Sequence, residues 1–182
     1  MKCSARIFSF SVVLLVVLCC LSCEKQEPAQ EKDVIESANE GLVVFSKEDF
    51  WGYKTKSGAV VIEPRFVVAN AFNPEGGATV VDEEGWAFIN KKGKVLVRPF
   101  VFDNGPDDFK EGLARFVQDG KMGFFEPSGA IAIPATYDFI LPFENGVAKV
   151  CMECEKVMSG EHFTVEGGVW TTIDRGGKTI EP

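Results

Sequence analysis

The residues best suited to chemistry lie near the C-terminal end of the sequence. Cys151 and Cys154 form a Cys-x-x-Cys motif, and His162, the only histidine of the chain, follows them. A local disulfide suits an oxidising compartment, whereas structural zinc needs a fourth ligand, for which Glu153 or Glu161 would have to serve. A thioredoxin-like centre needs the motif at a helix N-terminus in a βαβ unit. We take the disulfide as the candidate and predict no metal and no cofactor; the other readings and free thiols stay open.

The remaining residues offer little for catalysis. One histidine cannot build a Ser-His-Asp triad or a two-histidine metal site, and no Gly-rich phosphate loop joins a strand to a helix. The chain has enough Asp and Glu residues for a glycosidase-like carboxylate pair, so such a pair stays possible. Most of them, however, lie in turn-like stretches such as VDEEG and NGPDDFKEG, where a solvated role is expected. The net charge of −8 without a basic patch argues against nucleic acid. We therefore expect a protein that is not an enzyme.

The first forty residues are expected to lie outside the fold. Two basic residues precede an apolar, uncharged run that is shorter than a membrane-spanning helix and ends in small residues, as a secretory signal does. Cys23 follows and resembles the acylated cysteine of a bacterial lipoprotein, although Cys20 stands where an aliphatic residue is usual. The sequence predicts a signal peptide at 1–22, lipid attachment at Cys23 and a flexible acidic tether at 23–40. An ordinary signal peptide or an uncleaved signal anchor is the alternative. Each of them places the rest of the chain outside the cytoplasm.

Four similar units make up residues 41–182. They begin at glycines spaced 36, 35 and 34 residues apart, namely Gly41, Gly77, Gly112 and Gly146. Each unit has a short apolar strand, a residue pair heading a second strand, a turn glycine, and a third apolar strand that ends in proline. This pattern predicts an all-β fold of about four units, each with three short antiparallel strands. It leaves open whether the units close like a small propeller or stack as a solenoid.

The repeated positions have separate structural roles. Large side chains alternate along the second strands and are predicted to form the repeat core: Trp51, Tyr53, Trp86, Phe88, Met122, Phe124 and Trp170. The small residue between them predicts close approach of another backbone. The repeat turns are expected at glycines in hairpin positions: Gly58, Gly93, Gly129 and Gly177. A phenylalanine in each connector is expected to anchor it under the meander, at Phe72, Phe109 and Phe143.

The fourth unit carries an insertion. From the opening glycine to the Trp-type position the first three units span 10, 9 and 10 residues, and the fourth spans 24. The additional stretch, about residues 151–168, contains the Cys-x-x-Cys motif.

The stretches WGYKTKSGAVVIEPRF and MGFFEPSGAIAIPATYDFILPFENGVAKV resemble the WG (KWG) repeat family over about residues 41–182. Met122 replaces the family's Trp, and Ala87 and Thr171 replace its Gly. The resemblance implies an interaction module, in which such an insertion is a family option.

We therefore expect a lipid-anchored protein of the bacterial cell envelope that presents a non-enzymatic repeat module for protein interaction or scaffolding. The alternatives are a carbohydrate-binding envelope protein and a glycosidase-like enzyme. The expected partners are the membrane, through the anchor, and an envelope protein or glycan. Exposed aromatic residues flanked by Asp or Asn would favour a sugar, whereas a smooth acidic rim would favour a basic protein.

Overall fold

The computed structural model describes residues 41–160 and 162–180, and these residues form strands and turns with no helix. The first unit contains β1 (Val43–Lys47), β2 (Phe50–Lys54), β3 (Val60–Phe66) and β4 (Val68–Ala69). The second contains β5 (Gly77–Asp82), β6 (Gly85–Asn90), β7 (Val95–Pro99), β8 (Val101–Phe102) and β9 (Gly105–Pro106). The third contains β10 (Ala114–Gln118), β11 (Lys121–Phe125), β12 (Ile131–Tyr137) and β13 (Phe139–Ile140). The fourth contains β14 (Val147–Ser159), β15 (His162–Asp174) and β16 (Thr179–Ile180).

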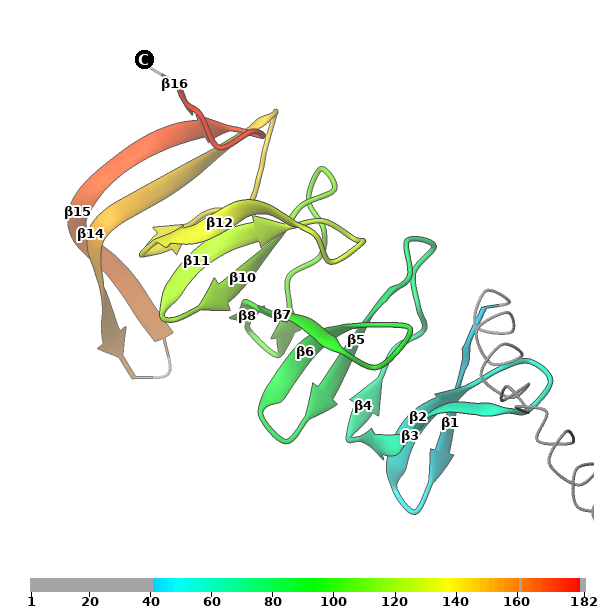
Figure 1. Cartoon of the computed structure of the whole chain (residues 1–182). Helices are drawn as coiled ribbons and strands as arrows, with labels where there is room; N and C mark the ends of the chain where they lie inside the picture. The colour runs from blue at the N-terminus through cyan, green and yellow to red at the C-terminus, as the bar shows by residue number, and fades with distance from the viewer. Residues whose placement is uncertain (1–40, 161, 181–182) are drawn as a thin grey trace, which may run out of the picture.

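The units form an open, extended array. In each unit three successive strands pair as an antiparallel meander, and the units follow one another so that the first and last described strands lie at opposite ends (Figure 1). The all-β prediction is therefore confirmed. Of the two arrangements that the sequence left open, the described residues adopt the solenoid-like stack, in which each unit contacts its neighbours in the chain.

The hydrophobic core is divided among the three junctions between units. At the first junction, Tyr53 and Ile62 of the first unit pack with Ala78 and Val80 of the second. The second junction buries Phe88, Val97, Ala114, Phe116 and Phe125. The third junction is the largest and includes Met122, Phe124, Ile133, Ala148, Val150 and Ile173. A single meander has too little buried surface to be stable alone, so each unit depends on its neighbours.

The connector phenylalanines anchor the units as predicted. Tyr53 packs on Phe72 with ring centroids 4.6 Å apart, and Phe124 packs on Phe143 at 4.7 Å. Phe109 contacts both Phe88, at 6.0 Å, and Phe125, at 5.2 Å. The Tyr53 hydroxyl also donates a hydrogen bond of 2.7 Å to the carbonyl oxygen of Asn70 in its connector.

The glycine of the Trp-Gly pair makes room for the third strand. A Cβ atom at Gly52 would lie 2.7 Å from the Pro64 nitrogen, and one at Gly123 would lie 2.7 Å from the Ala135 nitrogen, with a carbonyl oxygen closer still at both positions. Both sites lie where the register of the second and third strands shifts. The expectation that another backbone approaches here is confirmed, because the irregular third strand crosses directly over the glycine.

The turn glycines also have the predicted conformation. Their φ angles are positive at all four predicted positions, with values of 100°, 74°, 83° and 80° in chain order. An added Cβ atom at Gly58 would meet nothing within 4 Å, but the turns of the later units lie against the unit before them: Gly93 packs on Ile62, and Gly177 on Ile133. A side chain at these later turns would meet both backbone strain and a neighbouring unit.

The second junction differs from the other two. At the first and third junctions, β4 and β13 pair with the first strand of the next unit. At the second, β10 pairs with Arg98 and Pro99 of β7, so units two and three share one seven-stranded sheet, whose seventh strand is β4 of the first unit. The displaced segment folds into a hairpin of β8 and β9. Ala87 occupies the glycine position of this unit, and β7 pairs with Phe88 and Ile89 of β6 but not with Trp86.

Candidate functional site

The Trp-type positions do not all lie in the core. Met122 is fully buried, but Trp51 is 38% exposed and Trp170 is 41% exposed, while Trp86 is partly buried. The core prediction is therefore wrong for Trp51 and Trp170, although it holds for Tyr53, which is buried. Trp51 lies near the start of β2, beside the first turn, whereas Trp170 lies within β15, opposite Cys151 of β14. Met122 is covered because it belongs to the large cluster at the third junction.

The turns between the first and second strands define one side of the array, which we call the first-turn edge. It consists of residues 47–50, 82–85 and 118–121, and these turns lie at the opposite ends of the strands from the second turns (Figure 1). Its carboxylates outnumber its two lysines, Lys47 and Lys121: Glu48, Asp49, Asp82, Glu83, Glu84 and Asp119. The second turns of the first, second and fourth units instead carry lysines, as in the sequence NKKGK at 90–94, whereas that of the third unit, EPSG at 126–129, has none.

The hairpin of β8 and β9 projects an apolar side chain at this edge. Phe102 is 63% exposed and Val101 is 41% exposed, and Asp103 and Asn104 form the turn next to them. A Cβ atom on Gly105 would lie 4.0 Å from the Trp86 ring. The corresponding β4 and β13 segments of other units are paired into sheets. At the second junction, which we call the slipped junction because β10 pairs with β7 instead, the equivalent segment is an exposed hairpin. We call its exposed Phe102 side chain the Phe102 knob.

A crevice of about 350 Å³ lies between the first two units. Its lining combines both charges with apolar groups: Arg65, Phe66, Asp82, Glu83, Glu84 and Val95. Arg98 forms ion pairs with Asp82 at 2.7 Å and with Glu84 at 2.6 Å. The hydrogen bond from Arg98 lowers the pKa of Asp82, although burial opposes this effect. Asp82 is therefore held ionised, which is the opposite of what a glycosidase requires of its acid.

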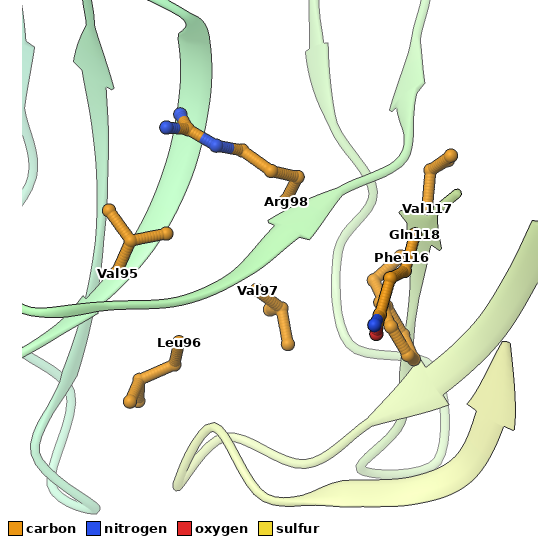
Figure 2. Close-up of a pocket in the computed structure, with 7 residues that line it drawn as sticks. All are labelled: Val95, Leu96, Val97, Arg98, Phe116, Val117 and Gln118. Carbon is orange, nitrogen blue, oxygen red and sulfur yellow. The ribbon is translucent and has the colours of Figure 1, made fainter. Parts of the chain in front are cut away.

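A smaller cavity of about 180 Å³ lies where β7 and β10 separate, and Figure 2 shows the side chains around it. Its lining is mainly apolar and includes Leu96, Val97, Phe116 and Val117. The only charged side chain of the lining, Arg98, points away from these residues in Figure 2 and is paired with carboxylates. This cavity is therefore best explained as a packing defect of the slipped junction.

Cys151 and Cys154 are joined in a disulfide, as predicted, with their Cα atoms 6.1 Å apart. Asp138 supports the bridge, since its carboxylate accepts a hydrogen bond of 2.6 Å from the Glu153 N–H and one of 2.5 Å from Lys121. The bond from Lys121 is the main cause that lowers the pKa of Asp138. The bonded sulfurs are not available as thiolate metal ligands.

A cationic and aromatic cluster lies beside this bridge. The Lys156 ammonium is 5.4, 5.6 and 5.5 Å from the ring centroids of Phe100, Phe139 and Phe163. Burial, followed by the nearby charge of Arg115, lowers the pKa of Lys156. The buried Arg115 guanidinium lies 4.5 Å from the Phe100 ring centroid.

Arg115 also joins the second and third units. It forms a bidentate ion pair with Asp107 in the connector of the second unit, and it donates a hydrogen bond of 3.0 Å to the carbonyl oxygen of Ile140. The Nε, Nη1 and Nη2 groups of Arg115 therefore each donate to an acceptor inside the protein. For this reason Arg115 is a structural cation and not an anion receptor.

Three sequence predictions concern residues that the structure does not describe. The signal peptide at 1–22, lipid attachment at Cys23 and the tether at 23–40 lie outside the described residues. Within residues 41–160 and 162–180, no three His, Cys, Asp or Glu side chains converge to hold a metal ion. The same ranges contain no helix long and apolar enough to cross a membrane.

Sequence reasoning missed the Phe102 knob. The signal was present, because Asp-Asn-Gly between Val-Phe and Pro is a hairpin signature. It also missed Lys156, whose aromatic neighbours Phe100 and Phe139 come from other units, and the pair of Arg115 with Asp107, eight residues before it.

Comparison with known proteins bears on the repeats. The family model described as WG containing repeat matches residues 51–85, 86–121 and 122–153. No curated protein and no solved structure matches the chain. The three matched segments cover more than half of the sequence. Each begins at a Trp-type position, near the start of β2, β6 or β11. The chain therefore belongs to the WG containing repeat family.

Proposed function

We propose that this protein is a cell-envelope interaction module, which binds a partner protein through its first-turn edge. The observation that carries the proposal is the exposed Phe102 side chain on a hairpin that makes no sheet contact with the next unit. Burying a phenylalanine is worth about 1.5–3 kcal/mol. The exposed Phe102 ring, next to the exposed Val101, therefore offers a partner an apolar contact.

The charge around the knob indicates the kind of partner. Asp103 adjoins Phe102, and the turn at 82–85 adds three carboxylates, of which Glu83 is not paired with Arg98. A complementary partner would offer an apolar pocket surrounded by basic side chains. Opposite charges of this kind increase the association rate and select among partners more than they raise affinity.

A lipid anchor at Cys23 would hold the array at a membrane. The acidic stretch at 23–40 would then serve as a flexible spacer, because its composition has too few apolar residues to fold. We propose this arrangement on the signal sequence alone. Replacing Cys23 with Ala should move the protein from the membrane fraction to the soluble fraction, and unchanged fractionation would refute the anchor.

Glycan binding is the second candidate. Exposed aromatic residues beside Asp or Asn favour it, and both Phe50, next to Asp49, and Phe102, next to Asp103, meet this condition. Phe50 is exposed on the same edge as the knob. Aromatic rings stack on sugar faces while neighbouring carboxylates accept hydrogen bonds from hydroxyl groups.

The test uses the full chain, purified in detergent and immobilised, to retain proteins from envelope extract at several salt concentrations. We expect specific retention by the wild type, a loss of at least tenfold with Phe102→Ser, and unchanged retention with Lys92→Glu on the second turns. Equal retention by all three proteins, or none above background, would refute the proposed edge. Competition by a purified envelope polysaccharide, with no protein retained, would favour the glycan instead.

A further inference from the structure

The long hairpin of the fourth unit is bent at its disulfide. Strands β14 and β15 pair regularly up to Met152 and Val169, and again from Cys154 and Gly167. Between them, Glu153 has a φ angle of 61° and Gly168 one of 69°, and both are left-handed conformations. The ladder is therefore interrupted on both strands at the same level, and the ribbon curves at this part of the hairpin (Figure 1).

The disulfide and a straight strand exclude each other. Residues three apart in a regular strand have Cα atoms about 10 Å apart, at roughly 3.3 Å per residue. A disulfide requires a separation below about 7 Å, and Cys151 and Cys154 are 6.1 Å apart. As long as the bond is closed, the strand must stay bent between them.

The bend places the outer half of the hairpin against the array. Cys154, Phe163 and Val165 pack on the core of the third junction. Lys156 reaches the rings of Phe100 and Phe139, which belong to the second and third units. A hairpin continuing straight from Met152 would carry these groups away and uncover both rings.

The remaining forces at the bend oppose one another. The hydrogen bond from the Glu153 N–H to Asp138 favours the docked form, as do the apolar contacts. The left-handed conformation of Glu153 disfavours it, at about 1–2 kcal/mol for a residue that is not glycine. Gly168 fits because a Cβ atom there would lie 2.5 Å from the Cys154 sulfur and 2.8 Å from the Cys151 sulfur.

We propose that the Cys151–Cys154 disulfide is a redox latch that keeps the hairpin docked, and that a dithiol reductant releases it. The reductant thiolate attacks the Cys154 sulfur, because Cys154 is partly exposed and Cys151 is buried. A mixed disulfide forms and Cys151 leaves as a thiolate, which takes up a proton. The second thiol of the reductant then displaces Cys154, so that two electrons leave the dithiol, which becomes a disulfide, and the protein gains two thiols.

The four-residue loop closed by the bond sets the expected size of the effect. Closing a loop of four residues removes entropy from the released hairpin. Loss of the disulfide bond should therefore shift the equilibrium between docked and released hairpin by about 20-fold toward release. The test is hydrogen–deuterium exchange of the full chain in detergent, oxidised and after dithiothreitol. We expect amides at 154–159 and 163–167 to exchange at least tenfold faster after reduction, whereas those of β2 and β3 keep their rates.

A double variant, Cys151→Ala with Cys154→Ala, is the matched control, because the chain has other cysteines near its N-terminus. It should exchange fast in the hairpin whether or not reductant is present. Equal hairpin exchange in the oxidised and reduced protein would overturn the proposal. A uniform increase across all four units would overturn it as well, because the bond would then stabilise the whole domain and not latch one hairpin.

Discussion

Substituting Gly123 with Ala tests the role of the Trp-Gly glycine most sharply. The added methyl group would lie 2.7 Å from the Ala135 nitrogen and 2.7 Å from a Phe116 ring carbon, with the Ile133 carbonyl oxygen closer still. Two of these three neighbours are backbone atoms of the paired strand β12, which cannot move without breaking the ladder. Overpacking of this kind costs about 3 kcal/mol, at the upper end of its usual range. The lower entropy of the unfolded Ala chain offsets about 0.7 kcal/mol, so we expect a loss of about 2 kcal/mol.

Gly105→Ala is the matched control. This glycine has no positive φ angle, and the nearest atom to an added Cβ is the Trp86 ring at 4.0 Å. It should leave stability unchanged or raise it by about 0.5 kcal/mol. The assay is urea denaturation followed by tryptophan fluorescence, supported by a Tm that falls by about 7 °C for Gly123→Ala. If the free energies of unfolding of the two variants differ by less than 0.5 kcal/mol, the crossing of the third strand does not explain why position 123 is glycine.

The remaining predictions concern buried polar groups. Asp107→Asn should cost about 3 kcal/mol, because it leaves the Arg115 charge buried without its partner; urea denaturation measures this, and a change below 1 kcal/mol would contradict it. Tyr53→Phe should cost about 1 kcal/mol by removing the bond to Asn70. Burial raises the pKa of Tyr53, so absorbance at alkaline pH should show one of the two tyrosines still un-ionised at about pH 11 in the folded protein and not in Tyr53→Phe. The pKa of Asp138 is lowered from its ordinary 3.8, so the folded state binds its proton less readily and this stabilisation is present above pH 3.8. The free energy of unfolding, measured with urea, should therefore decrease as the pH falls below about 4, and it should decrease less in Asp138→Asn than in the wild type. The same dependence on pH in both proteins would contradict this.

The periodic features of the fold could be predicted from the sequence because they repeat. The turn glycines, the connector phenylalanines and the close approach at Gly52 each depend on contacts within a unit or with the next one. The same local contacts recur in each unit, so four copies of a pattern give one consistent answer. The disulfide could also be proposed, because its two cysteines are three residues apart.

The exposed tryptophans and the knob could not be predicted in the same way. Alternation along the strand assigns Trp51 to the face of Tyr53, but it says nothing of where the neighbouring unit ends. The slip at the second junction depends on which of two segments, β8 or the end of β7, pairs with β10. That choice depends on competition between backbone ladders, and the sequence shows only the Asp-Asn-Gly hairpin signature and Ala87 in the glycine position.

Photocross-linking in living cells tests the central claim most directly. The full chain would carry benzoylphenylalanine in place of Phe102 on the first-turn edge or, as the control, in place of Lys92 on a second turn. The account predicts one discrete protein adduct from position 102 and none from position 92, with the adduct lost when Glu83 and Asp103 are changed to lysine. Adducts of equal yield from both positions, or none from position 102, would contradict the interaction edge.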